Sequence, residues 1–319
     1  MSAAVPADIV CLGEPLAEFT RLPDSGGNRW LAGYGGDTSN CAIAAARQGA
    51  RVGYLTALGA DPFGDSFLEL WRAEGIVTSG VKRDPEAQTG VYFITHDTSG
   101  HHFTYYRTGS AASRMRAADL PGNRIAGAKV LHVSGISQAI SASAYEAVAR
   151  ALALANESGV RVCYDPNLRL RLWPLERARA VIDATAAQAW YVLTNAEEGR
   201  LLTGRERVAE IAAAYLDLGA RVVAVKMGAE GVLVATGAEH RRIAGHAVAC
   251  VDASGAGDAF DGAFLAETVA GRDPLAAAAY ANAAAALATI GYGAVAPIPR
   301  RAEVEAFLAR ARTAGSAPI

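Results

Sequence analysis

From residue 130 onward, short apolar runs alternate with helix-like segments, and no other feature of the sequence limits the fold as strongly. The apolar runs lie at 130–133, 160–164, 190–193 and 222–226, and the helical segments between them at 142–157, 177–189 and 208–218. Strands that alternate with helices in this way form a mainly parallel sheet with helices on both faces. The sequence therefore predicts an α/β fold.

The flanking parts of the chain extend this pattern. Strands are expected at 9–12 and 52–57. One helix is expected at 37–48, and a second helix is expected to end near Gly75. Residues 17–34 are expected to form a loop or short strand, because Pro23 and several glycines interrupt the chain there. Residues 231–235 and 243–251 look like a later antiparallel pair. Residues 274–290 carry no charge but are mostly alanine, which predicts a buried helix and no membrane span.

Two segments near residue 100 have the composition of a β-hairpin. Residues 89–95 and 103–107 are rich in aromatic and β-branched side chains, and a polar turn separates them. No linker or composition shift divides the chain, so we expect a single domain over 1–319. The hairpin is the candidate for a small β lid, built from residues 14–35 and 88–108.

The overall charge excludes one class of protein. Thirty Lys and Arg residues against 32 Asp and Glu residues give a formal net charge of -2. A non-specific nucleic-acid binder would need a basic face, so no nucleic-acid partner is expected. The four cysteines lie far apart, and the N-terminus has no signal-like pattern. These features predict a cytoplasmic protein with reduced thiols and no membrane partner.

The sequence Asp-Ala-Ser-Gly-Ala-Gly-Asp at 252–258 is the strongest chemical signal. It follows an apolar run and precedes an apolar helix, so Gly255 and Gly257 can bring backbone N–H groups close to a ligand. The helix start adds a positive dipole end, which suits a phosphoryl group. Asp258 can then accept a proton from a hydroxyl nucleophile. The alternative is a tight turn in which Asp258 only caps the helix.

This segment resembles the C-terminal signature of the ribokinase/PfkB family of sugar kinases, D-T-x-G-A-G-D, with Ala253 at the Thr position. Three further motifs of the family occur before this segment, in the family's order, so that the resemblance covers nearly the whole chain. The first is Gly35-Gly36 with Asn40, then Gly59, Asp61 and Gly64. The second is Asn195-Ala196-Glu197-Glu198, and the third is Lys226-Met227-Gly228-Ala229-Glu230-Gly231. The resemblance implies a ribokinase-like three-layer α/β/α fold with a mainly parallel central sheet and a small β lid. It also implies ATP and Mg²⁺ as cofactors, and it leaves a monovalent cation near Asp252 open.

The resemblance implies roles for individual residues. Asp258 is the expected base, beside an anion hole formed by Gly255, Ala256 and Gly257. The nucleotide and its phosphates are expected to contact Asn167, Asn195, Lys226, Gly228, Gly231, Ser254, Gly255 and Gly257. Magnesium is expected near Asn195 and Glu198, held through water.

Within the family, the segments at 33–40, 103–107, 134–137 and 167–173 are most similar to members that phosphorylate 2-keto-3-deoxygluconate at its terminal hydroxyl. Arginine can bind the carboxylate of such a sugar acid through charge-assisted, bidentate hydrogen bonds. The expected substrate contacts are Gly35, Gly36, Asp37, Asn40, Tyr92, Tyr106, Arg107 and Arg169. Because Tyr105 and Tyr106 alternate across a strand, one of the two can be a packing residue.

Several alternatives stay open on the sequence. The substrate can be the galactonate epimer, or a neutral sugar such as fructose or ribose, and a catalytically silent sugar-binding protein can share the fold. The C-terminal loop at 291–295 has no acid where some relatives place an Asp. Exposed lid strands and the family resemblance together predict a homo-oligomer, a dimer or higher.

Overall fold

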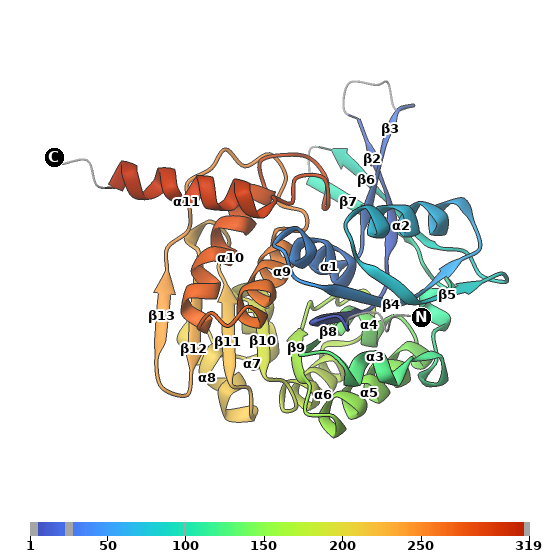
Figure 1. The fold of residues 1–319 in the computed structure, drawn as a ribbon, viewed down its shortest axis with the longest axis horizontal. Coiled ribbons are helices and arrows are strands. Elements are labelled where there is room, and N and C mark those ends of the chain that lie inside the picture. The colour runs from blue at the N-terminus through green and yellow to red at the C-terminus, as the bar shows by residue number, and fades with distance from the viewer. Residues whose placement is uncertain (1–5, 23–27, 98–99, 316–319) are drawn as a thin grey trace.

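The computed structural model describes residues 6–22, 28–97 and 100–315, and its centre is a nine-stranded sheet (Figure 1). The strand order is β13-β12-β11-β10-β9-β8-β1-β4-β5. Every neighbouring pair is parallel except those that involve β12, which confirms the α/β prediction. The strands are β1 (Ile9–Leu12), β4 (Val52–Gly59), β5 (Val77–Asp84), β8 (Val130–Ser134), β9 (Arg161–Asp165), β10 (Tyr191–Asn195), β11 (Val222–Lys226), β12 (Val232–Thr236) and β13 (His240–Ile243).

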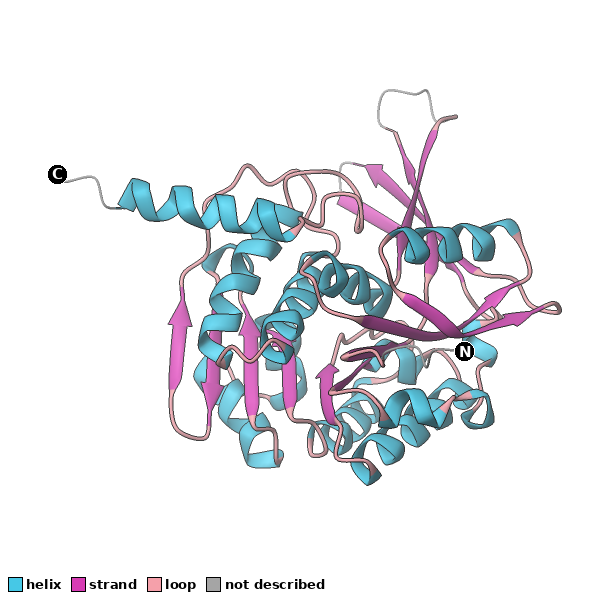
Figure 2. Cartoon of the chain, in the orientation of Figure 1, coloured by secondary structure: helices cyan, strands magenta, loops and turns pink. Residues whose placement is uncertain are grey.

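Helices cover both faces of this sheet, as Figure 2 shows. Strand β1 illustrates the result: Ile9 and Cys11 pack into one apolar core, and Val10 and Leu12 pack into the other. A strand that is buried on both faces reads as a continuous apolar run, which is why it was visible in the sequence. The first core contains residues of α1 (Asp37–Arg47), α2 (Pro62–Ala73), α9 (Ala256–Val269), α10 (Pro274–Ala288) and α11 (Arg301–Gly315). The second contains residues of α3 (Gly122–Ala126), α4 (Gly135–Ala139), α5 (Ala142–Glu157), α6 (Leu175–Ala186), α7 (Ala196–Thr203) and α8 (Val208–Leu218).

A second sheet of four strands projects from the body at one end (Figure 1), and we call it the small sheet. Its order is β3-β2-β6-β7, with β2 parallel to β6 and the two outer pairs antiparallel. The strands are β2 (Leu16–Arg21), β3 (Trp30–Gly35), β6 (Gly90–Asp97) and β7 (Gly100–Tyr106). They come from the segments expected to form a lid, apart from residues 23–27 and 98–99, which lie outside the described residues. Closure over a substrate, and the single-domain organisation, stay predictions.

Three local expectations need correction. Strand β5 was not foreseen, because it is a mostly half-exposed edge strand with no clear apolar alternation. The partner of β12 is residues 240–243, whereas the apolar run at 247–250 has no regular structure. A tight turn follows β12, in which Thr236 N donates to Glu239 O over 2.8 Å. The polar residues 240–243 come directly after this turn and therefore pair with β12. Residues 16–35 contain two regular strands.

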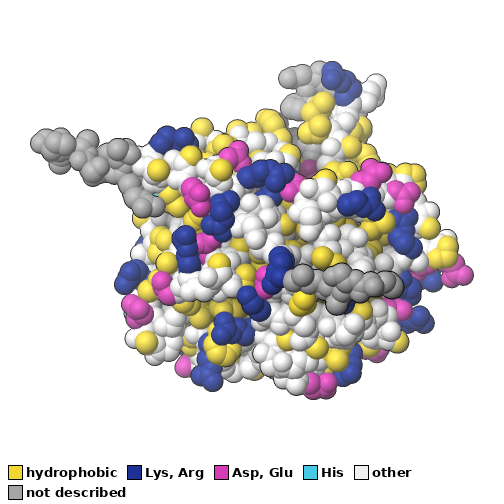
Figure 3. Space-filling model, viewed as in Figure 1, with side chains coloured by type: hydrophobic (Ala, Val, Ile, Leu, Met, Phe, Trp, Pro, Cys, Tyr) yellow, Lys and Arg dark blue, Asp and Glu magenta, His cyan; other side chains and the backbone are white. Residues whose placement is uncertain are grey.

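Across the described ranges, no helix is long and apolar enough to cross a membrane. The face of the molecule in Figure 3 carries basic and acidic side chains side by side, with no broad patch of one sign.

Candidate functional site

The candidate site lies where the parallel strands of the large sheet end. Glu14 follows β1, Asp165 ends β9, Asn195 ends β10 and Lys226 ends β11. The chain runs from β1 to β4 and β5 on one side and from β8 onward on the other, so the strand order reverses at β1. In open parallel sheets, ligands bind at the carboxyl ends of strands beside such a reversal.

The glycine turn that precedes α9 has the geometry expected of an anion hole. Gly255 adopts a φ of 73° at the helix N-terminus, and a Cβ on it would lie 2.7 Å from the carbonyl oxygen of Ala294. Asp252 braces the turn, because its carboxylate accepts from Ser254 N at 2.9 Å and from Gly293 N at 3.0 Å. The first N–H groups of a helix have no acceptor within the helix and favour an anion.

Asp258 lies in the first turn of α9 and is held by a residue from α1. Asn40 Nδ2 donates to Asp258 Oδ2 over 2.8 Å. The pKa of Asp258 is raised to about 8, because burial and the charge of Asp37 raise it more than the hydrogen bond from Asn40 lowers it. A carboxyl group with a pKa near neutrality is suited to accept a proton from an alcohol.

Asp37 lies at the start of α1 and accepts two hydrogen bonds, whereas its contact with substrate stays a prediction. Its Oδ1 accepts from Thr38 N over 2.8 Å at the start of α1. Its Oδ2 accepts from Asn167 Nδ2 over 3.0 Å, and that bond joins the segment after β9 to α1. Four predicted residues, Asp37, Asn40, Asn167 and Asp258, are therefore brought together by α1, α9 and the end of β9.

Lys226 lies in a buried ionic cluster that the sequence analysis missed. Its Nζ is 2.9 Å from Asp261 Oδ1 and 3.4 Å from Asp165 Oδ2. Burial lowers the pKa of Lys226, but the carboxylates of Asp165 and Asp261 outweigh burial, and the net pKa lies above the ordinary value. A Cβ on Gly257 would lie 3.5 Å from this ammonium group, so the charge lies directly beside the glycine turn.

Asn195 and Glu198 form a capping box at the start of α7. Asn195 Oδ1 accepts from Glu198 N, and Glu198 Oε1 accepts from Asn195 N, each over 2.9 Å. Glu198 also accepts from Leu168 N at 2.9 Å and from Thr194 Oγ1 at 3.0 Å. Because these bonds occupy both carboxylate oxygens, the pair fits Mg²⁺ through bridging waters and not as a direct ligand. Among the described residues, no group of three or more His, Cys, Asp or Glu side chains is arranged to hold a metal ion by itself.

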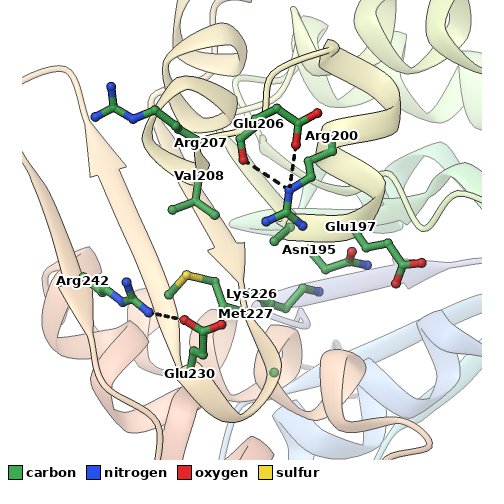
Figure 4. Close-up of a pocket in the computed structure, with 12 residues that line it drawn as sticks. Asn195, Glu197, Arg200, Glu206, Arg207, Val208, Lys226, Met227, Glu230 and Arg242 are labelled. Atoms are coloured by element: carbon green, nitrogen blue, oxygen red, sulfur yellow. Dashed lines mark hydrogen bonds and ion pairs between the residues drawn. The ribbon is translucent and has the colours of Figure 1, made fainter.

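A groove of about 630 Å³ opens beside this cluster (Figure 4). Two ion pairs, Arg242 with Glu230 and Arg200 with Glu206, lie at its margins, and Met227 and Val208 add apolar surface. A site of this volume with mixed lining can hold a small organic ligand. The predicted residues Asn195, Lys226 and Gly228 line the groove.

Gly231 and Ser254 do not belong to the lining of that groove. A Cβ on Gly231 would lie 2.1 Å from the carbonyl oxygen of Ile243, so this glycine permits close packing between β12 and β13. Ser254 donates its backbone N–H to Asp252, within the glycine turn. Ligand contacts by Gly231 and Ser254 stay predictions, and the structure gives each a role in a turn.

The small sheet presents aromatic side chains to the same region. The rings of Tyr92 and Tyr105 stack with centroids 5.5 Å apart, and Arg107 lies 5.4 Å above the Tyr105 ring. The Tyr92 hydroxyl donates to the buried Glu18. Glycine is required at position 35 on β3, two strands away, since a Cβ there would lie 2.4 Å from the Tyr92 hydroxyl.

Tyr106 lies on the other face of the small sheet from Tyr92. It is paired with Val91, packs edge-on against Phe93 and is 61% exposed. Successive side chains of a strand point to opposite faces, so Tyr105 and not Tyr106 shares the face of Tyr92. A substrate contact by Tyr106 stays a prediction.

The two predicted arginines have different surroundings. Arg107 forms an ion pair with the buried Glu14. Arg169 donates to the carbonyl oxygen of Leu168 over 2.9 Å and has no carboxylate partner among the described residues. The next arginine, Arg171, donates to Phe103 O over 3.2 Å, so this segment lies beside strand β7 of the small sheet.

Four residues of the candidate site were missed by sequence reasoning: Glu14, Glu18, Asp165 and Asp261. Only their positions carried a signal, since Glu14 and Asp165 occur where a buried apolar run ends and Asp261 lies one helical turn after Asp258. Their partners are distant in the chain. The spacing of residues therefore could not reveal the contacts.

Comparisons with known proteins identify the family to which the chain is similar. Residues 6–301 match the model of the pfkB family of carbohydrate kinases. The 2-dehydro-3-deoxygluconokinase of Thermoproteus tenax is 36% identical, with 92% of this chain and 93% of the relative covered. Fructokinase-2 of Solanum habrochaites is 31% identical, with 94% and 95% covered. A crystal structure of fructokinase from Vibrio cholerae O395 with fructose, ADP and calcium has a TM-score of 0.85 and 30% identity, and covers 95% of this chain and 99% of that chain.

Proposed function

We propose that this chain, which belongs to the pfkB family of carbohydrate kinases, transfers the γ-phosphoryl group of MgATP to the terminal C6 hydroxyl of 2-keto-3-deoxygluconate. The products are 2-keto-3-deoxy-6-phosphogluconate and ADP. ATP-dependent phosphorylation of a sugar follows from the family, and the sugar acid is the proposal. The substrate name 2-dehydro-3-deoxygluconate, carried by the Thermoproteus relative, denotes the same compound.

In this mechanism Asp258 removes the proton of the C6 hydroxyl as its oxygen attacks the γ-phosphorus. Asn40 orients the carboxylate through its 2.8 Å hydrogen bond. Backbone N–H groups of the glycine turn stabilise the charge on the transferring phosphoryl oxygens, and the Lys226 ammonium group, paired with Asp165 and Asp261, lies beside the turn. Mg²⁺, held through water by Asn195 and Glu198, would neutralise charge on the ATP phosphates. The groove beside Lys226 is proposed to hold the nucleotide.

Arg169 is the single observation that carries the assignment to a sugar acid. Arg169 is exposed and no described carboxylate pairs with it, and the nearby Arg171 donates to Phe103 O of the small sheet. The candidate site is rich in carboxylates, namely Glu14, Glu18, Asp37 and Asp258. A substrate carboxylate needs an unpaired cation in such surroundings, and Arg169 supplies one.

The first experiment measures ADP release from MgATP with 2-keto-3-deoxygluconate, its galactonate epimer, fructose and ribose. Turnover confined to the two keto-deoxy acids supports the proposal and reduces the question to the epimer. Turnover on fructose or ribose alone would assign the enzyme to neutral sugars. No turnover with any sugar would favour a silent sugar-binding protein.

A neutral-hexose kinase is the second candidate, because two observations favour it. Fructokinase-2 of Solanum habrochaites is 31% identical over nearly the whole chain. Glu14 also neutralises Arg107, so only one of the two predicted arginines presents an unpaired charge. The same four-sugar panel decides between the candidates.

Replacing Arg169 by Gln tests the role of its charge. We expect KM for 2-keto-3-deoxygluconate to rise about 10- to 100-fold, since a hydrogen bond to a charged group contributes about 1.5–3 kcal/mol. KM for 3-deoxyfructose, which has a hydroxymethyl group in place of the carboxylate, should change little. Arg171→Gln is the matched control, because Arg171 bonds a backbone carbonyl. An equal loss with both sugars would contradict the carboxylate contact.

The pH dependence of kcat/KM tests the state of Asp258. Its pKa is about 8, so the carboxyl is largely protonated at pH 6 and cannot act as a base. We expect kcat/KM to rise with pH and to level off above pH 8. Asn40→Ala removes the bond that stabilises the charged form, so the profile should shift to higher pH. A profile that is flat between pH 6 and pH 9 would contradict this assignment.

A homo-oligomer stays part of the proposal. Four large apolar side chains, Trp30, Leu31, Phe63 and Tyr106, are each at least 39% exposed, and three of them belong to the small sheet. Exposed apolar surface beside an open sheet edge favours association. The molecular mass in solution, measured by light scattering, tests this expectation.

A further inference from the structure

An ion pair joins two of the chain crossings that connect the large sheet with the small sheet. Glu14 lies in the crossing between β1 and β2, and Arg107 begins the crossing that returns from β7. Arg107 Nη2 donates to Glu14 Oε2, and Ser110 Oγ donates to Glu14 Oε1 over 3.2 Å. The pair therefore fixes Arg107 where the small sheet meets the body.

The ion pair is shielded from solvent. The Glu14 side chain has no exposed surface, and the Arg107 side chain is 11% exposed. Paired charges of opposite sign in such surroundings behave as a dipole and not as a free cation. Arg107 Nε is also buried and has no hydrogen-bond partner among the described residues. Arg107 thus keeps one unused donor but little net charge.

We propose that Glu14 is a specificity-determining residue, which neutralises Arg107 so that the substrate carboxylate is bound by the charge of Arg169 alone. Arg107 then contributes a hydrogen bond from Nε and a rigid edge for the Tyr105 ring. This inference rests on the proposed function, because it presumes a substrate that carries a carboxylate.

The neutralisation of Arg107 by Glu14 matters for binding because other carboxylates lie nearby. Asp37 interacts electrostatically with Glu14, and Asp258 interacts with Asp37. Removing the Arg107 charge alone would leave Glu14 as a further unpaired carboxylate beside an acidic cleft. Removing Glu14 alone would expose a second cation. Each single change is therefore expected to alter the discrimination between acidic and neutral sugars, in opposite directions.

A double-mutant cycle with Glu14→Gln, Arg107→Gln and the combined variant tests this. Calorimetry measures Kd for 2-keto-3-deoxygluconate and for its neutral counterpart 3-deoxyfructose, at pH 8 because burial raises the pKa of Glu14. We expect Arg107→Gln to weaken binding of the acid relative to the neutral sugar by about tenfold, and Glu14→Gln to strengthen it by about threefold or more. The combined variant restores a neutral pair, so its acid-to-neutral ratio should lie within about threefold of wild type.

A different result for the combined variant would overturn the proposal. If Arg107 bound the substrate carboxylate with its own charge, the combined variant would discriminate as poorly as Arg107→Gln, and the proposal would be overturned. Failure of wild type to bind the acid would instead refute the proposed function, whatever the cycle shows.

The midpoint of thermal unfolding should fall in both single variants and recover in the combined one. If the single variants do not fold, the ratio of wild type to the combined variant decides alone.

Discussion

Replacing Asp258 by Asn is expected to lower kcat by about 10²- to 10⁴-fold with little change in KM for the sugar. Asn keeps the shape of the side chain and can still bond Asn40 through a reoriented amide. It cannot accept the proton of the attacking hydroxyl, so the loss falls on the chemical step. Steady-state ADP release with saturating MgATP measures the effect.

Unfolding provides the control for this variant. The pKa of Asp258 in the folded protein, about 8, lies above its ordinary value near 4. The folded state therefore binds the proton more tightly, and the free energy of unfolding decreases as the pH rises from about 4 to about 8. Asp258→Asn removes this buried charge, so its thermal midpoint at pH 8 should be equal to or above that of wild type.

Asp273→Asn is the matched substitution at another helix. Asp273 caps α10 by accepting from Leu275 N and Ala276 N, and Asn caps a helix as well as Asp does. This variant should keep wild-type turnover. Turnover of Asp258→Asn above about one tenth of wild type would show that another group removes the proton.

Replacing Gly255 by Ala is expected to lower kcat by about 10²- to 10³-fold, the range found when a donor to a developing anion is lost. A Cβ at this position would lie 2.7 Å from the carbonyl oxygen of Ala294, and a φ of 73° is unfavourable for alanine. The turn must therefore shift, and its N–H groups move away from the transferring phosphoryl group. Single-turnover kinetics with MgATP separate this loss from weaker nucleotide binding.

Gly271→Ala separates backbone strain from displacement of the anion hole. Gly271 has a φ of 93° just after α9, and a Cβ there would meet no atom within 4 Å. The variant shares the conformational cost, about 1–2 kcal/mol, without the clash. We expect a lower thermal midpoint with unchanged kcat. Equal loss of kcat in both variants would show that reduced stability, and not the anion hole, explains the effect at Gly255.

Local patterns in the sequence were sufficient for most of the architecture. Strands buried on both faces read as continuous apolar runs, which identified β1, β8, β10 and β11, and their alternation with helices identified the parallel sheet. The half-exposed edge strands β5 and β13 were missed or misplaced, because their pairing depends on neighbours and not on an apolar pattern. The glycine turn at 252–258 was identified because its backbone demands leave few residue choices.

Within the site, the sequence identified residue types but not their partners. It placed Asp258 and Lys226 in the site, yet Asn40 and Asp258 are 218 positions apart, and Lys226 and Asp261 are 35 apart. It could not choose between Tyr105 and Tyr106, because strand alternation leaves open which face of the small sheet lies toward the cleft. Packing of the sheet against the body decided that.

The two arginines show most clearly what the sequence determined and what only the tertiary structure decided. The sequence determined that Arg107 and Arg169 are present in segments suited to bind a sugar acid. Only the tertiary structure decided that Glu14, 93 positions away, pairs with Arg107, while Arg169 donates to the carbonyl oxygen of Leu168 and pairs with no carboxylate among the described residues. Charge is a property of the residue, but its effect on a ligand depends on burial and on the nearest opposite charge, and both arise when the chain folds.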